Sequence, residues 1–498
     1  MIKRFLLAVT VLVIATLTAP VAFAQDARSV ISAASKTMGV DGLNSVTMAG
    51  AGSNGALGQS PKPGGPWVRT NASDYTRTID FTQPALRASG VTYAVPIGGT
   101  TAVQGVFNQS ITPMTPGGWT QQLNIWTTPW GFLKGAAANN ATVKTQTIGG
   151  KRYSVVTWSP AEKAPSGKAY QVVGYINDQN LVEKVDTWVE HIMFGDMLVE
   201  TTYSDYRDNN GLKFPETIVQ KQGGQPTFEA TLSFASANPS NLALLMQPPT
   251  PAGRGGGPGG PGGPGGPGAP AVANFEKLAD GVYKITGGYT ALAIEFSDHI
   301  VVVEAGQSDA RAEAVLEQAR KAIPNKPIRY VVNTHHHFDH ASGLPYVAAQ
   351  GITIITHEAN KELYERALNA PRTLGDDALT KKGGTVKPKF EYVTGDKKVL
   401  QDATRTLELH LIKGLQHADG MLVAYLPKEK ILLQGDLYGA PNPNAPAPPP
   451  NAPPNMGTVQ FLDNVQRLGL NVEQIVSVHA PNPDRQIPMQ EVVASVRR

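Results

Sequence analysis

The sequence predicts two domains of different class, a mainly antiparallel β domain followed by a layered α/β domain. The chain has 498 residues, which is more than one ordinary domain holds. A stretch of almost pure Gly and Pro, from Pro248 to Pro270, divides it. Before this stretch, apolar and polar residues alternate as in half-buried strands, whereas after it strand-like runs are interleaved with helical patterns.

The N-terminus has the pattern of a secretory signal. Met1-Ile2-Lys3-Arg4 gives a basic start, an apolar stretch continues to about Leu17, and Ala22-Phe23-Ala24 gives a small-x-small end. We therefore predict that residues 1–24 are a signal peptide and that the mature protein is periplasmic or secreted from a bacterium. The apolar part is short and Pro20 interrupts it, so an uncleaved membrane anchor is the weaker interpretation.

Charge and composition narrow the classes of partner. The formal net charge is +3 and there is no basic run, so we expect no nucleic-acid partner. The absence of cysteine excludes disulfides, thiolate ligands and a lipid-modified cysteine anchor. After signal cleavage no segment is long and apolar enough for stable membrane insertion. A small-molecule substrate is the expected partner, and the sequence leaves the oligomeric state open.

Residues 25–246 are predicted to form the β domain. Residues 227–234 alternate between polar and apolar, which gives a strand with one dry face, carrying Phe228, Ala230, Leu232 and Phe234. Asn209-Asn210-Gly211 predicts a hairpin turn. Residues 27–37 predict a short helix, and residues 119–130 have no regular pattern.

All six tryptophans lie in this first domain, at positions 67, 119, 126, 130, 158 and 188. They could line a groove for an apolar ligand, which would make the domain weakly similar to the open half-barrels of periplasmic lipoprotein-carrier proteins. Alternatively, they fill the concave face of a curved sheet as core. Large aromatic side chains bury well without a ligand, so the core interpretation is favoured.

Residues 247–272 are predicted to be a disordered spacer, because Gly and Pro with a single charge, Arg254, cannot bury apolar surface. Residues 273–498 then form the α/β domain. A second proline-rich stretch, Pro441 to Pro454, is either a spacer or a loop beside the site. Apolar runs predict strands at 280–285, 291–296, 300–303, 329–333, 352–355, 406–412, 421–425, 431–434 and 474–478, and helical spacing predicts helices at 310–323, 358–367 and 459–468.

The most informative segment is residues 334–340, which contain four histidines and one aspartate directly after an apolar run. His335 and His337 are two residues apart, so an extended or tightly turning backbone projects both rings toward one ion. Asp339 and His340 leave the turn in another direction, where they could hold a second ion. Imidazole and carboxylate ligands without thiolate fit Zn²⁺ and tolerate Fe or Mn.

A histidine-rich tract on a solvated surface is the alternative to a metal site. Three further candidate ligands argue against it. His417, Asp436 and His479 each follow a strand-like apolar run. A strand end is a rigid place to hold a ligand, so these positions favour a metal centre.

With these residues the C-terminal half, from roughly Asn274 onward, resembles the metallo-β-lactamase-fold metallohydrolase superfamily, whose mark is His-x-His-x-Asp-His followed by a distant His, Asp and His. The resemblance implies a four-layer αββα sandwich. It also implies two Zn²⁺ ions per chain, with Fe or Mn as alternatives. One ion would be held by His335, His337 and His417, the other by Asp339, His340 and His479, and Asp436 would bridge them.

The resemblance further implies a dinuclear zinc-dependent hydrolase, which the predicted signal peptide would place in the periplasm. A metal pair lowers the pKa of a shared water to roughly 7, so a metal-bridging hydroxide could attack an ester, amide or related bond. Asp339 would orient this water as well as bind metal. One departure from the family pattern is Glu304-Ala305-Gly306, where many members carry an Asp, which puts the support of the histidine loop in doubt.

Two other functions remain open from the sequence. An iron-dependent oxidoreductase of the same fold, similar to a persulfide dioxygenase, could use overlapping ligands. An envelope ligand-binding protein could carry a vestigial metal domain. Among the other histidines, we expect His336 to be structural, His410 to pack or support a ligand, and His357 to cap a helix or be exposed.

Overall fold

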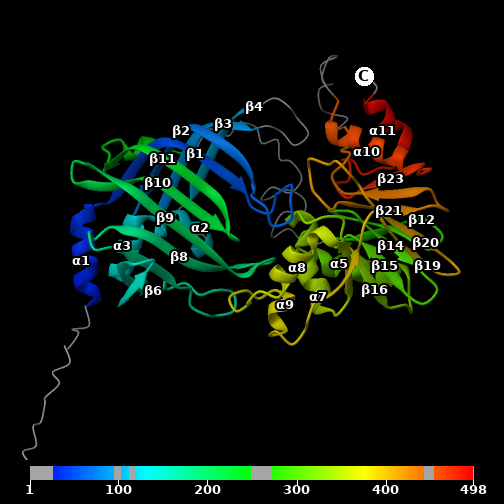
Figure 1. Ribbon diagram of the computed structural model, residues 1–498, viewed down its shortest axis with the longest axis horizontal. Helices are drawn as coiled ribbons and strands as arrows, with labels where there is room; N and C mark the ends of the chain where they lie inside the picture. Colours follow the sequence, from blue (N-terminus) through cyan, green and yellow to red (C-terminus); the bar gives the residue numbers. More distant parts are fainter. Residues whose placement is uncertain (1–25, 95–102, 112–117, 248–271, 442–453, 497–498) are drawn as a thin grey trace, which may run out of the picture.

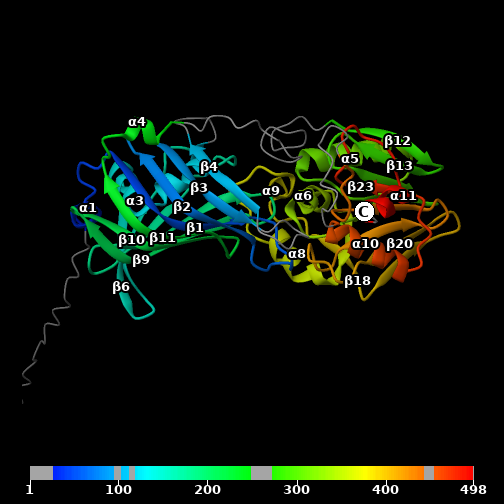
Figure 2. The same ribbon diagram turned by 90° about the horizontal axis from the view of Figure 1, so that it is seen from above.

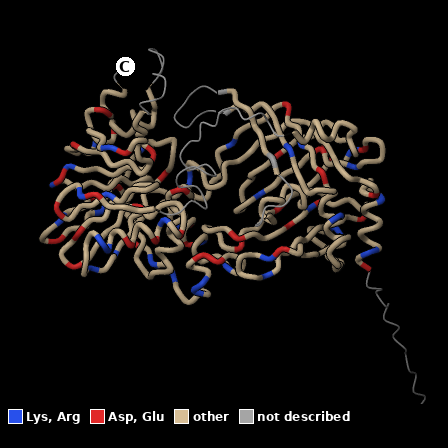
Figure 3. The backbone as a smooth tube through the Cα atoms, turned by 180° about the vertical axis from the view of Figure 1, so that it is seen from behind, with Lys and Arg blue, Asp and Glu red and all other residues tan. Residues whose placement is uncertain are grey.

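The computed structural model describes residues 26–94, 103–111, 118–247, 272–441 and 454–496, which form two bodies lying side by side (Figure 1). The predicted signal peptide, nearly all of the predicted spacer and most of the second proline-rich stretch lie outside the described residues. No helix within these ranges is long and apolar enough to cross a membrane. Basic and acidic residues are interspersed over both bodies (Figure 3).

The first body is built on one antiparallel sheet of eleven strands, as the alternating pattern predicts. Its order is β4-β3-β2-β1-β11-β10-β9-β8-β7-β6-β5, so the first strand pairs with the last and all other neighbours are consecutive. The strands are β1 Ser45–Ala56, β2 Val68–Asp80, β3 Ala85–Ala94, β4 Val103–Ile111, β5 Thr142–Ile148, β6 Lys151–Trp158, β7 Val172–Ile176, β8 Val182–His191, β9 Gly195–Asn209, β10 Leu212–Gln222 and β11 Gln225–Ala237.

Two details of this sheet test the predicted pattern. Asn210 and Gly211 have φ of 53° and 84° and form the tight turn between β9 and β10, as predicted. The prediction for Phe234 was wrong, because its side chain is 47% exposed. Phe234 pairs with Ala49 but Leu232 pairs with Gly50, so the register shifts by one residue between these pairs. Beyond this bulge the side chains of β11 point to the opposite faces of the sheet.

Helices pack against this sheet and complete its core. They are α1 Ala27–Met38, α2 Gly118–Trp126 and α3 Pro129–Ala138, whereas the short α4 Leu242–Leu245 has no buried residue. The expectation that residues 119–130 are irregular was wrong. Thr128 caps α3 by accepting a hydrogen bond from the backbone N–H of Gly131, and Pro129 suits the first turn. Four of the six tryptophans are buried in the core, as the favoured interpretation expects, whereas Trp126 and Trp188 are partly buried against it; the four are Trp67, Trp119, Trp130 and Trp158.

The second body contains two stacked sheets. The first has the order β12-β13-β14-β15-β16-β17-β18 and the second the order β19-β20-β21-β22-β23-β24. The strands are β12 Asn274–Ala279, β13 Val282–Thr286, β14 Ala291–Glu295, β15 Ile300–Val303, β16 Ile328–Val332, β17 Thr353–His357, β18 Lys389–Val393, β19 Lys397–Gln401, β20 Thr406–Leu411, β21 Leu422–Leu426, β22 Ile431–Gln434, β23 Gln474–Ser477 and β24 Ile487–Pro488.

Helices cover the outer faces of both sheets, which gives the predicted αββα layers (Figures 1 and 2). In β15, Val301 and Val303 pack between the sheets, whereas Ile300 and Val302 pack beneath helices, so both faces are dry. Ser308 caps the first helix by accepting a hydrogen bond from Arg311 N. The helices are α5 Asp309–Ala322, α6 Phe338–Ala341, α7 Leu344–Ala349, the 3₁₀ turn η1 Glu358–Asn360, α8 Lys361–Leu368, α9 Ala378–Lys381, α10 Met456–Arg467 and α11 Met489–Val496.

The two domains are joined by a polar contact beside β8 and β9. The guanidinium group of Arg372 donates to the carbonyl oxygens of Ile192 and Met193 at 2.8 and 2.7 Å. The carboxylate of Asp196 accepts hydrogen bonds from the backbone and hydroxyl of Thr373, both at 2.7 Å. These directional contacts fix the orientation of the second domain relative to the first.

Candidate metal centre

All seven sequence-predicted ligands come together at the ends of strands in the second domain. The histidine loop follows β16 and runs into α6, and His417 lies in the loop between β20 and β21. Asp436 and His479 each lie just beyond the neighbouring parallel strands β22 and β23. Because these strands are buried, the positions of their last residues are held rigidly.

The seven side chains form two groups that share one carboxylate. The first contains His335, His337, His417 and Asp436, and the second contains Asp339, His340, Asp436 and His479. Within each group the candidate ligand atoms all lie within 4.8 Å of one another. This is the division that the resemblance implies, with Asp436 in both groups. Their role as ligands remains a prediction.

The imidazole nitrogens in this centre converge on Asp436. Its Oδ2 lies 2.9 Å from Nε2 of His417, and its Oδ1 lies 3.0 Å from Nε2 of His340 and 2.9 Å from Nε2 of His479. Nδ1 of His337 is buried and makes no hydrogen bond to any residue in the described part of the chain. Buried polar atoms normally have a partner, and a divalent cation would provide one.

Residues behind the centre orient two of the rings. Oε2 of Glu304 lies 3.2 Å from Nδ1 of His340, so that ring donates from Nδ1 and turns its Nε2 toward the centre. The other oxygen of Glu304 accepts a hydrogen bond from the backbone N–H of Thr334 at 2.7 Å. The hydroxyl of Thr334 lies 3.1 Å from Nδ1 of His335. Glu304, which stands where many members of the family carry an Asp, therefore supports the histidine loop through both oxygens of its carboxylate.

The surroundings of the first group keep its residues in the protonation states that bind a cation. Burial lowers the pKa of His335 well below its usual value and that of His337 to about 3, so both rings are neutral near pH 7. Although burial opposes ionisation of Asp436, the charge of His340 and the surrounding hydrogen bonds hold its pKa well below the usual range. Neutral imidazole and ionised carboxylate are the forms that bind metal.

The sequence pattern missed three residues that contact this centre. The hydroxyl of Tyr289 donates to Oδ2 of Asp339 at 3.3 Å, and its ring lies 4.6 Å from the ring of His479. Gln59 and Ser60 reach the histidine loop from the first domain. No spacing signal marks Tyr289, and the contacts of Gln59 and Ser60 depend on how the domains dock, which one sequence does not reveal.

The other histidines have roles outside the two groups. His336 is buried against the first domain and donates from Nε2 to the carbonyl oxygen of Ser60 at 2.7 Å, a structural role as expected. His410 packs in β20 and pairs with Glu408 at 2.8 Å. His357 caps η1 by accepting a hydrogen bond from Ala359 N, which agrees with the expected capping role.

The sequence of the second domain matches a known family. Residues 286–470 match the model of the Metallo-beta-lactamase superfamily, a range that includes all the candidate ligands except His479. This part of the chain belongs to the metallo-beta-lactamase superfamily. The fold and the two groups of histidine and aspartate indicate a divalent-metal site in a metal-dependent enzyme.

A curated protein that is similar to part of this chain is 2,4-dinitroanisole O-demethylase subunit alpha from Nocardioides sp. (strain JS1661). It is 25% identical over 207 residues, which are 41% of this chain and 56% of the relative, so the chain spans little more than half of that protein's length. Solved structures that resemble the chain include a metallo-beta-lactamase from Pontibacter korlensis, 19% identical, covering 45% of this chain and 97% of that chain with a TM-score of 0.34. Another is FIM-1 from Pseudomonas aeruginosa, 18% identical, covering 46% and 95% with a TM-score of 0.33.

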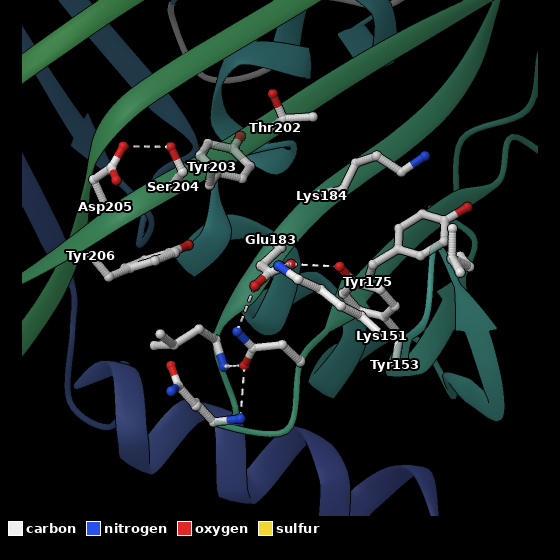
Figure 4. A pocket seen from close by; sticks show the side chains of 14 residues that line it. Lys151, Tyr153, Tyr175, Glu183, Lys184, Thr202, Tyr203, Ser204, Asp205 and Tyr206 are labelled. Atoms are coloured by element: carbon white, nitrogen blue, oxygen red, sulfur yellow. Dashed lines mark hydrogen bonds and ion pairs between the residues drawn. The ribbon is translucent and has the colours of Figure 1, made fainter.

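The candidate metal centre is most accessible at its second group. The side chains of His479 and Asp339 are 29% and 26% exposed, whereas those of His335 and His340 are fully buried. The centre is therefore open to solvent beside Asp339 and His479. A separate cavity of about 600 Å³ lies in the first domain among strands β5 to β9, where Tyr153 donates to Glu183 at 2.6 Å (Figure 4). None of the predicted ligands lines that cavity.

Proposed function

We propose that this protein is a dinuclear zinc-dependent hydrolase of the bacterial periplasm that cleaves an ester, amide or related bond of a small molecule. The observation that supports it best is the pair of ligand groups that share Asp436. When bound, two Zn²⁺ ions would act as Lewis acids and lower the pKa of a water molecule to about 7. The two groups hold only imidazole and carboxylate, which suits zinc.

The chain's own residues would orient the reactants at the exposed side. Asp339 is ionised, because the charge of His340 and a hydrogen bond from His479 outweigh the effect of burial and lower its pKa. It would accept a hydrogen bond from the attacking water. Burial and the nearby carboxylates raise the pKa of Tyr289, so its hydroxyl stays protonated and can donate.

The test combines metal analysis with an unbiased hydrolysis screen. Protein purified from its native compartment should contain about two zinc ions per chain and cleave at least one of β-lactams, lactones, thioesters, phosphodiesters or sulfate esters. Asp339→Ala should abolish cleavage with an unchanged circular dichroism spectrum. His410→Gln, which changes a histidine outside the centre, should keep activity. Full activity in a chelator-stripped, metal-free preparation would contradict the proposal.

The same measurements decide between the alternatives. Iron in place of zinc would favour the oxidoreductase. The curated relative is named as an O-demethylase, so 2,4-dinitroanisole belongs in the screen as a substrate. Lipid co-purifying with an otherwise inactive, metal-free protein would favour the ligand-binding alternative. Cell fractionation and N-terminal sequencing of the mature protein, expected to begin at Gln25, test the proposed location.

A further inference from the structure

The loop between β1 and β2, residues 57–67, extends from the first domain toward the second (Figures 1 and 2), where it contacts Asp339 of the metal centre. Gly58 lies against Phe338, whose backbone N–H donates to the Gly58 carbonyl oxygen at 3.3 Å. The φ of Gly58 is +85°, and a Cβ there would lie 2.3 Å from a ring carbon of Phe338. Only glycine permits this approach. Trp67 packs edge to face on the same ring at 5.9 Å.

The two residues after Gly58 contact the candidate ligands. Nε2 of Gln59 donates to Oδ1 of Asp339 at 2.9 Å. The carbonyl oxygen of Ser60, which is fully buried, lies 3.0 Å from Nε2 of His337. A carbonyl oxygen can only accept, so His337 carries its proton on Nε2. Its Nδ1, the atom buried without a hydrogen-bond partner among the described residues, is then left as a free lone pair.

The loop is held in this position before any ligand binds. The hydroxyl of Ser60 donates to the carbonyl oxygen of Lys62 at 2.7 Å, and the backbone N–H of Val68 donates to the carbonyl oxygen of Gln59 at 2.8 Å. On the other side, the backbone N–H of Asp419, two residues after His417, donates to the carbonyl oxygen of Pro61 at 2.7 Å. The loop therefore contacts both segments that carry the histidines of the first group: the histidine loop with His335 and His337, and the segment with His417.

We propose that Gln59 and Ser60 are positioning residues of the metal centre, so that the first domain completes a site whose ligands all come from the second. The carbonyl oxygen of Ser60 fixes the tautomer of His337, and the amide of Gln59 fixes the carboxylate of Asp339. Such partners typically contribute 10- to 100-fold to metal affinity. Because coupling between two equilibria is reciprocal, bound metal also stabilises the docking of the two domains.

This inference rests on the proposed function only in assuming that the centre binds metal, whichever bond it cleaves. The test is titration of the metal-free protein with Co²⁺, followed by visible absorption, which reports coordination geometry. Gln59→Met keeps the side-chain volume but removes the amide. It should weaken Co²⁺ binding about tenfold and change the spectrum. Lys62→Ala, an exposed position in the same loop, should match the unmodified protein.

Hydrogen exchange of the unmodified protein gives a second measurement that does not depend on a variant folding. Bound Co²⁺ should slow exchange of the backbone N–H groups of Gln59 and Val68, which lie in the first domain. Gly58→Ala, which pushes the loop away from Phe338, should abolish this effect. Affinity within twofold of the unmodified protein for Gln59→Met, or unchanged exchange at these amides, would overturn the inference. A lack of Co²⁺ binding by the unmodified protein would overturn the metal centre itself, whereas binding without hydrolysis would overturn only the proposed reaction.

Discussion

Oε2 of Glu304 lies 3.2 Å from Nδ1 of His340, while its other oxygen accepts the backbone N–H of Thr334. The backbone of Glu304 has a φ of 70°, which a residue with a side chain rarely adopts. A single buried carboxylate thus holds both the start of the histidine loop and one of its candidate ligands.

Glu304→Gln should weaken metal binding at the second group by roughly 10- to 100-fold. The amide can still accept from Thr334, but its NH₂ group would face Nδ1 of His340 and favour the wrong tautomer. Competition with a chromophoric chelator measures the change. Glu313→Gln, on the outer helix α5, is the control and should have no effect. Equal affinities for both variants would show that Glu304 has no orienting role.

Metal binding should stabilise the folded protein strongly. A ligand that binds only the folded state at a thousandfold excess over its Kd adds about 4 kcal/mol to the free energy of unfolding. Zinc added to stripped protein should therefore raise Tm, measured by differential scanning calorimetry. Asp436→Asn should lose most of this increase, because Asp436 belongs to both ligand groups. An equal increase in that variant would contradict the shared role of the carboxylate.

Lowering the pH should reduce the free energy of unfolding, because His191 has a lower pKa in the folded protein than in the unfolded chain. Burial and the nearby Arg372 lower the pKa of His191 to about 4. Between that value and the unfolded pKa near 6.5, the unfolded state binds the proton and the folded state does not, so stability is full above about pH 6.5 and falls as the pH drops toward 4.

Protonation of His191 should lower the free energy of unfolding by up to about 3 kcal/mol between pH 6.5 and pH 4. It should appear as a difference in the pH dependence of unfolding between the unmodified protein and His191→Asn, with chelator present in both. Asparagine can still accept from the backbone N–H groups of Met193 and Phe194, as Nδ1 of His191 does. Parallel pH profiles for the two proteins would exclude this contribution.

Arg372→Met should destabilise the contact between the domains. The substitution leaves the partly buried carbonyl oxygens of Ile192 and Met193 without their donor, which should cost about 3 kcal/mol. Urea unfolding followed by tryptophan fluorescence measures it, since every tryptophan lies in the first domain. Arg320→Met, at the exposed end of α5, is the matched control. Equal midpoints for the two variants would show that this contact adds nothing.

Local patterns in the sequence predicted most of the second domain and all seven converging side chains. The central strands there, such as β15 and β22, are buried on both faces, so their apolar runs are continuous, and a helix start such as Ser308 has a local cause. Phe234 was misplaced because a shift in strand register, which depends on the partner strand β1, reverses a face without any local signal. The start of α3 did have a local signal, a capping Thr128 followed by Pro129, but the aromatic residues around it obscured the helical pattern.

The contacts of Gln59 and Ser60 illustrate what one sequence does not contain. Their loop is rich in Gly and Pro, which predicts a turn but not what the turn touches. They reach the histidine loop only because Arg372 and Asp196 fix the docking of the domains. Contacts across a domain interface leave no periodic pattern in the chain, so the predicted ligands were identified without the residues that orient them.

The pairing of β1 with β11 sets an order on how this protein is made. The first sheet can close once residue 237 has been synthesised, because its last strand ends there. Gln59 and Asp339 are 280 positions apart, so the loop between β1 and β2 gains this contact only when the second domain has folded. A chain truncated after residue 237 would thus contain the strands of the first sheet and no completed centre, so tight cation capture requires both domains.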